Sequence, residues 1–123
     1  MKLTGIPKLT HALRVQRKAL RTGRRMQVVA SSLRHKEFTR EEVHAHSDQM
    51  IYVLHGDGEA LLGGQRHDLQ RGDGLFVAAG KRLRLRNTGD EALRLLTVLS
   101  PPVFPEDFTE PFQPVAGDGD PED

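Results

Sequence analysis

The sequence predicts an all-β fold, a sandwich or barrel that forms a single domain. Turn signals made of Gly, Asp and Asn recur along the chain, and short strand-like runs with period-two alternation lie between them. These runs repeat about every ten residues, a spacing typical of sandwiches and barrels. A chain of 123 residues is long enough for one domain with a sizeable core, and no long helical pattern interrupts the strands.

Eight runs carry the strand signal, because they are rich in Val, Ile and Leu and several alternate apolar with polar residues. The predicted strands are residues 26–33, 42–46, 50–55, 59–62, 66–70, 75–78, 83–87 and 92–99. The segment 11–21 stays open, since its apolar residues at positions 12, 15, 19 and 20 also fit one face of a helix.

The composition excludes several classes of function. The chain has no cysteine, which excludes disulfides, thiol catalysis and cysteine-ligated zinc. Aromatic residues make up only 5% and Trp is absent, so we expect no base-stacking platform and no nucleic-acid partner. No run of 18 apolar residues and no secretory signal are present, so we expect no membrane partner and a cytoplasmic location.

Charge is spread unevenly although the net charge is only +1. Residues 1–40 hold eleven Lys or Arg and one acid, whereas residues 101–123 hold seven acids and no base. Such blocks are typical of solvated faces or tails, and the acidic end can screen the basic end within one chain or across a dimer. We therefore expect a basic arm at 1–17, a barrel at 18–102 and a Pro-rich acidic arm at 103–123.

The C-terminal arm has two parts in this interpretation. Phe104, Phe108 and Phe112 recur every four residues, but the surrounding prolines oppose a helix, so we expect an extended arm that lays these rings on the barrel. The stretch from Val115 to Asp123 is acidic and almost without apolar residues, and we expect it to be disordered.

The segment around residue 44 carries the candidate chemistry. His44 and His46 are two residues apart in a predicted strand, so their imidazoles would share one face and converge if that face is the barrel interior. Gln49 offers an amide oxygen as a third donor, and Asp48 offers a carboxylate. The alternative is a pair of surface histidines on an edge strand.

This pattern resembles the first motif of the cupin superfamily, and a second motif follows it at a compatible distance. The matching positions are His44, His46, Gln49 and Gly56 in the first motif and Gly72, Gly80 and Asn87 in the second. The resemblance covers residues 18–102. Within the superfamily, the chain most resembles a branch of small single-domain bacterial cupins. It implies an RmlC-like jelly-roll barrel with an interior site and, because such barrels pack an outer face or their N-terminal strands against a partner, a homodimer.

Two departures from the motifs fall at positions where the family has metal ligands. Gln49 stands where the family has a Glu ligand, and Leu83 stands where the second motif has its His. Residues 82–87 alternate Arg with Leu, so Leu83 and Leu85 point inward and the arginines outward. Leu83 therefore puts an apolar group at a ligand position.

Three functions remain in competition. The first is a small enzyme with a divalent metal (Fe, Mn, Ni, Zn or Cu) at His44, His46 and Gln49, acting on a small molecule by oxidation, isomerisation or lyase chemistry. In it Tyr52 or His67 would line the cavity and supply a proton. The second is a non-catalytic barrel for a small ligand that lost its metal through Leu83. The third is a metal-independent isomerase that uses His46 with Asp48.

Overall fold

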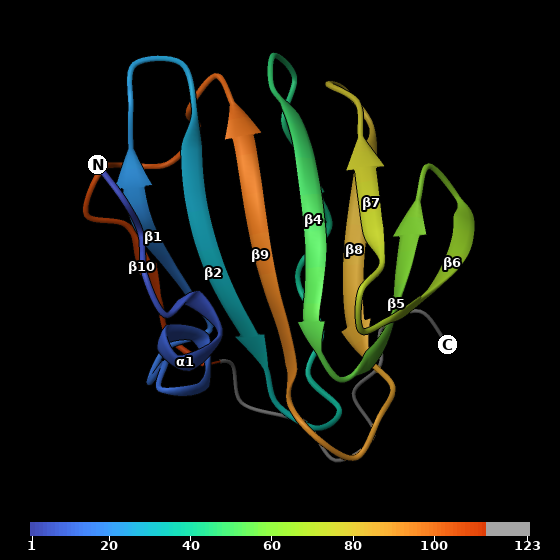
Figure 1. Cartoon of the computed structure of the whole chain (residues 1–123). Helices are drawn as coiled ribbons and strands as arrows, with labels where there is room; N and C mark the ends of the chain where they lie inside the picture. Colours follow the sequence, from blue (N-terminus) through green and yellow to red (C-terminus); the bar gives the residue numbers. More distant parts are fainter. Residues whose placement is uncertain (113–123) are drawn as a thin grey trace.

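The computed structural model describes residues 1–112, which form two antiparallel sheets facing each other (Figure 1). The six-stranded sheet has the order β10-β1-β2-β9-β4-β7 and the four-stranded sheet the order β3-β8-β5-β6. The elements are α1 (Ile6–His11), β1 (Arg17–Thr22), β2 (Gln27–Leu33), β3 (Glu42–Val43), β4 (Asp48–His55), β5 (Asp57–Leu62), β6 (Gln65–Gln70), β7 (Gly74–Val77), β8 (Arg82–Asn87), β9 (Leu93–Ser100) and β10 (Thr109–Glu110).

The predicted all-β jelly-roll fold is confirmed, and the eight predicted strands correspond to β2 through β9. The open segment 11–21 is divided differently: α1 ends at His11, and Arg17–Thr22 forms β1. Pairing with β2, the next strand along the chain, satisfies the backbone of β1, and this pairing outweighs the helical spacing of its apolar residues. No helix in residues 1–112 is long and apolar enough to span a membrane. The homodimer and the cytoplasmic location stay predictions.

The core lies between the two sheets and follows directly from strand alternation. Along β4 the residues alternate exposed and buried, and β8 and β9 show the same period, so each strand sends every second side chain inward. The main cluster consists of Leu33, Ile51, Val53, Ala60, Leu69, Leu75, Val77, Leu83, Leu85, Leu93 and Leu95. These residues come from both sheets, so burial of this cluster joins the sheets.

The C-terminal arm returns to the six-stranded sheet, so that sheet extends beyond residues 18–102 at both ends. β10 pairs with β1, with Arg17 opposite Glu110. Gln27 anchors the start of the arm: its amide nitrogen donates to the Phe104 carbonyl at 2.9 Å, and its oxygen accepts from the Val103 and Phe104 amides at 3.2 and 3.0 Å. The tail predicted to be disordered, 115–123, lies outside the described residues.

We expect Gln27→Ala to lower the free energy of unfolding by about 2–4 kcal/mol, because Gln27 is fully buried and its loss leaves polar groups of the arm without partners. Urea unfolding measures the difference. Gln70→Ala, at an exposed position of β6, is the matched control and should change little. Equal losses in the two variants would mean that Gln27 does not hold the arm.

Candidate functional site

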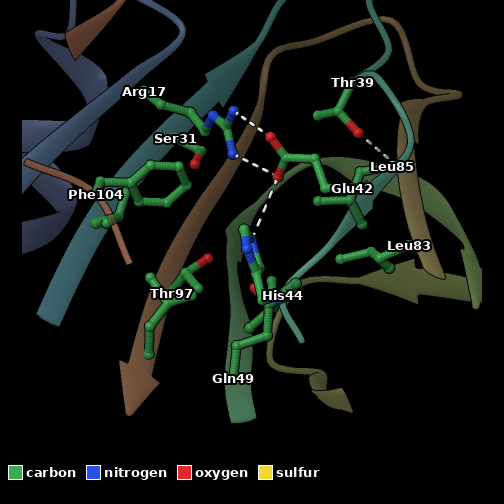
Figure 2. A pocket seen from close by; sticks show the side chains of 13 residues that line it. Arg17, Ser31, Thr39, Glu42, His44, Gln49, Leu83, Leu85, Thr97 and Phe104 are labelled. Carbon is green, nitrogen blue, oxygen red and sulfur yellow. Dashed lines mark hydrogen bonds and ion pairs between the residues drawn. The ribbon is translucent and has the colours of Figure 1, made fainter. Parts of the chain in front are cut away.

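A small polar cavity lies between the sheets and is lined by β1, β2, β3, β4, β8, β9 and the C-terminal arm (Figure 2). It measures about 30 Å³, and since one water needs roughly 10–15 Å³ of such space, it has room for about two water molecules. Its lining residues are Arg17, Val29, Ser31, Thr39, Glu42, His44, Gln49, Ile51, Leu83, Leu85, Thr97, Leu99 and Phe104. The polar groups therefore converge in an otherwise apolar interior.

Arg17 is the cationic centre of this cavity. It lies on β1, opposite Ser31 on one side and Glu110 on the other, so all three side chains share the inner face of the sheet. Its guanidinium donates to both oxygens of Glu42 at 2.8 and 2.6 Å and to both oxygens of Glu110 at 2.7 and 3.1 Å. Although burial opposes the charge of Arg17, these two carboxylates outweigh burial and raise its pKa further.

Glu42 connects the two sheets. It lies on β3 in the four-stranded sheet, opposite Leu83 of β8, and reaches across to Arg17. Burial alone would raise the pKa of Glu42, but its contacts with His44 and Arg17 outweigh burial and lower the pKa to about 2. The carboxylate is therefore charged across the physiological pH range.

His44 faces the same carboxylate from inside the cavity. Its Nε2 lies 3.7 Å from Glu42 Oε1, and Figure 2 shows Glu42 between His44 and Arg17. The backbone carbonyl of His44 accepts a hydrogen bond from the Gly80 amide at 2.9 Å, which fixes the residue beside the turn into β8; the φ of 85° at Gly80 is one that glycine adopts without strain. The ring of Phe104 meets the imidazole edge-on at 5.6 Å. Nδ1 makes no hydrogen bond within residues 1–112.

The structure corrects the expectation for His46. The predicted strand 42–46 ends at Val43, and residues 45–46 form a turn in which His46 is exposed and does not line the cavity. The chain needs this turn because it passes there from the four-stranded sheet to β4 of the six-stranded sheet. The alternation of inward and outward side chains therefore applies to residues 42–44. Glu42 and His44 form the inward pair in place of His44 and His46.

The other candidate residues are divided between cavity and exterior. Gln49, Leu83 and Leu85 are buried and line the cavity. Tyr52 is 43% exposed, because on β4 it alternates with the inward Ile51 and faces away from the barrel interior. His67 is half-buried on β6 at the far edge of the four-stranded sheet and is not part of the cavity lining. Neither Tyr52 nor His67 is placed to serve a ligand in this cavity.

The donor set facing the cavity does not fit a divalent metal well. Only His44 and Gln49 of the three expected ligands line the cavity, and Leu83 adds no donor. Both oxygens of Glu42 are hydrogen-bonded to Arg17. Within residues 1–112 no three His, Asp or Glu side chains are grouped as a metal site would require. No step in the proposal below is routed through a metal.

Sequence reasoning missed Arg17 and Glu42, the two residues that organise the cavity. Arg17 was the last residue of the segment assigned to the basic arm, and nothing in its neighbourhood marks it as inward-facing. Glu42 could have been found, since it stands two residues before His44 on the same strand face. Arg17 becomes recognisable only once the fold brings positions 17 and 42 together.

The fold and cavity of residues 1–112 define a small jelly-roll barrel with an internal polar site. The family model described as Cupin domain matches residues 32–99, and the chain belongs to the cupin family. The structure of BH2720 from Bacillus halodurans is similar with a TM-score of 0.85 and 27% identity, over 90% of this chain and 89% of that one.

Two curated relatives carry polyketide synthase names. The chain is 38% identical over 61 residues to the polyketide synthase CurC of Streptomyces cyaneus, covering 50% of this chain and 40% of the relative. It is 32% identical over 65 residues to the tetracenomycin polyketide synthase protein TcmJ of Streptomyces glaucescens, covering 53% and 44%. The matched stretch thus spans less than half of these relatives.

Lowering the pH should lower the free energy of unfolding, because the contacts of Glu42 depend on its charge. Because its pKa falls from 4.5 in the unfolded chain to about 2 in the fold, Glu42 stabilises the protein above pH 4.5, and this contribution is lost as the pH falls toward 2. The loss is at most about 3 kcal/mol. Urea unfolding between these pH values should show it in the wild type and in Glu41→Gln, an exposed control, but not in Glu42→Gln. Parallel profiles for all three would contradict the assignment.

We expect Leu83→His to raise the affinity for Ni²⁺ or Zn²⁺ at least about tenfold, because it adds an imidazole beside His44 and Gln49. The substitution should also destabilise the metal-free protein by about 1–3 kcal/mol. Calorimetric metal titration tests it. Leu69→His, at a buried position outside the cavity lining, is the control. Equal affinity in the two variants would place position 83 away from His44.

Proposed function

We propose that this cupin binds a small carbonyl compound in the cavity and moves a proton on it, with His44 as the base and Glu42 as its partner. The observation that carries this proposal is the chain of contacts Arg17–Glu42–His44, in which a carboxylate held ionised by a guanidinium faces Nε2 of an imidazole. A histidine oriented by a carboxylate is a common general base.

The chemistry needs two further elements, and the cavity offers both. Nδ1 of His44 can take a proton from a carbon next to the carbonyl; the electron pair of the broken C–H bond forms a C=C bond to the carbonyl carbon, and the π pair of the carbonyl moves to its oxygen. The imidazolium then faces the Glu42 carboxylate. Ser31, Gln49 and Thr97 line the same space with neutral donors for the developing enolate.

The names of the relatives agree with this class of substrate. Polyketide chains carry carbonyl groups with acidic neighbouring C–H bonds, and their conversion involves such proton transfers. The similarity to CurC and TcmJ covers half of this chain, so a carbonyl substrate for the present barrel is a proposal that these relatives support.

The competing proposal is the metal site of His44, His46 and Gln49. It differs from ours in one residue, because His46 is essential to the metal site and dispensable to the His44–Glu42 pair. The two proposals also differ in their response to a chelator. A barrel that only binds its ligand would share the cavity but move no proton.

The test is deuterium incorporation into the methyl groups of pyruvate and pyruvamide in D₂O, followed by proton NMR. We expect the wild type to accelerate exchange on at least one of the two compounds, and His44→Ala to reduce this acceleration by about 10²–10⁴-fold. His46→Ala is the matched control and should retain it, also in the presence of EDTA. Loss of exchange in His46→Ala or with EDTA would favour the metal site, and no exchange in the wild type would favour simple binding.

A further inference from the structure

The two carboxylates on Arg17 differ in how they are held. Glu42 belongs to β3 and also contacts His44, so it is tied into the barrel. Glu110 belongs to the two-residue strand β10 of the C-terminal arm, and within the described part of the chain its carboxylate contacts Arg17 alone. Glu110 therefore occupies one bidentate edge of the guanidinium from the short strand at the edge of the six-stranded sheet.

The same arm also closes the cavity. Phe104 lines it, Phe108 stacks on Phe104 with ring centroids 4.2 Å apart, and the Arg17 guanidinium lies 5.1 and 5.5 Å from the two ring centroids. The remaining space of about 30 Å³ admits about two waters. A carbonyl compound larger than that needs more room, and movement of the arm, whose Phe104 lines the cavity, would supply it.

The hydrogen bonds indicate which part can move. Gln27 fixes the backbone at Val103 and Phe104 with three hydrogen bonds. Beyond that point β10 pairs with β1 over only two residues, next to which the Gln16 amide donates to the Glu110 carbonyl at 2.7 Å and the Ala19 amide donates to the Phe108 carbonyl at 2.9 Å. Residues 105–112 can therefore lift from β1 while the anchor at Gln27 stays in place.

We propose that the cavity takes a ligand bearing a carboxylate, and that this carboxylate replaces Glu110 on Arg17 as residues 105–112 lift. In the absence of the ligand, Glu110 then occupies the position on Arg17 that the carboxylate of the ligand would take. The replacement conserves charge, since one carboxylate leaves the guanidinium and another binds to it with the same bidentate geometry. This inference rests on the proposed function and adds the acid group to the substrate class.

Calorimetric titration with pyruvate and pyruvamide tests it, because the two probes have similar shape and differ in charge. Glu110→Gln should bind pyruvate at least about tenfold more tightly than the wild type, while its affinity for pyruvamide changes less than about threefold. Glu106→Gln, an exposed acid on the same arm, should behave as the wild type. Equal gains for both probes, or no gain for pyruvate, would overturn the proposal.

A measurement on the wild type avoids any effect of Glu110→Gln on folding. Saturating pyruvate should speed hydrogen exchange at the Gln16 and Ala19 amides, which bond to the arm, more strongly than pyruvamide, which has no carboxylate to replace Glu110 on Arg17. Unchanged exchange at both amides would overturn the proposal. If the His44 ring signals respond to either probe but Glu110→Gln does not change the affinity for pyruvate, only the carboxylate inference fails. If His44 responds to neither probe in any variant, the proposed function fails with it.

Discussion

The burial of Arg17 between two carboxylates is the constraint on which the rest of the site depends. A guanidinium whose side chain is only 12% exposed must be paired and hydrogen-bonded, since an unpaired charge in that place costs several kcal/mol. The partners come from three parts of the fold: Arg17 from the six-stranded sheet, Glu42 from the four-stranded sheet and Glu110 from the C-terminal arm. One charged group thus ties both sheets and the arm together.

This arrangement also determines the chemistry that the cavity can support. Glu42 is oriented by Arg17 and faces His44, so the carboxylate is engaged on one side by a guanidinium and on the other by an imidazole. Leu83 lies opposite Glu42 across the β3–β8 pair and contributes only apolar surface. Our proposal of proton transfer rests on this set of one imidazole, one amide and a carboxylate paired with Arg17.

The sequence predicted the parts of the fold that depend on local pattern. Alternation identified β2 to β9, and it predicted the inward direction of Leu83 and Leu85 on β8. It did not predict β1, because the strand state of Arg17–Thr22 depends on pairing with the following strand β2 and with β10, which is distant in the sequence. The position of His46 depended on where β3 ends, and the passage between the sheets sets that end. The resemblance to cupins located the site at His44 and Gln49, but Arg17 joins it only through the fold.

The central claim, that Arg17 is held rigidly between Glu42 and Glu110, can be measured directly by NMR of the arginine side chains. Our account predicts a resolved Arg17 Nε–H signal with slow solvent exchange and separate Nη resonances, because all three guanidinium nitrogens donate to carboxylates. Arg21, exposed on the same strand, serves as the reference for a solvated side chain. An Arg17 signal that exchanges and averages like that of Arg21 would contradict the account.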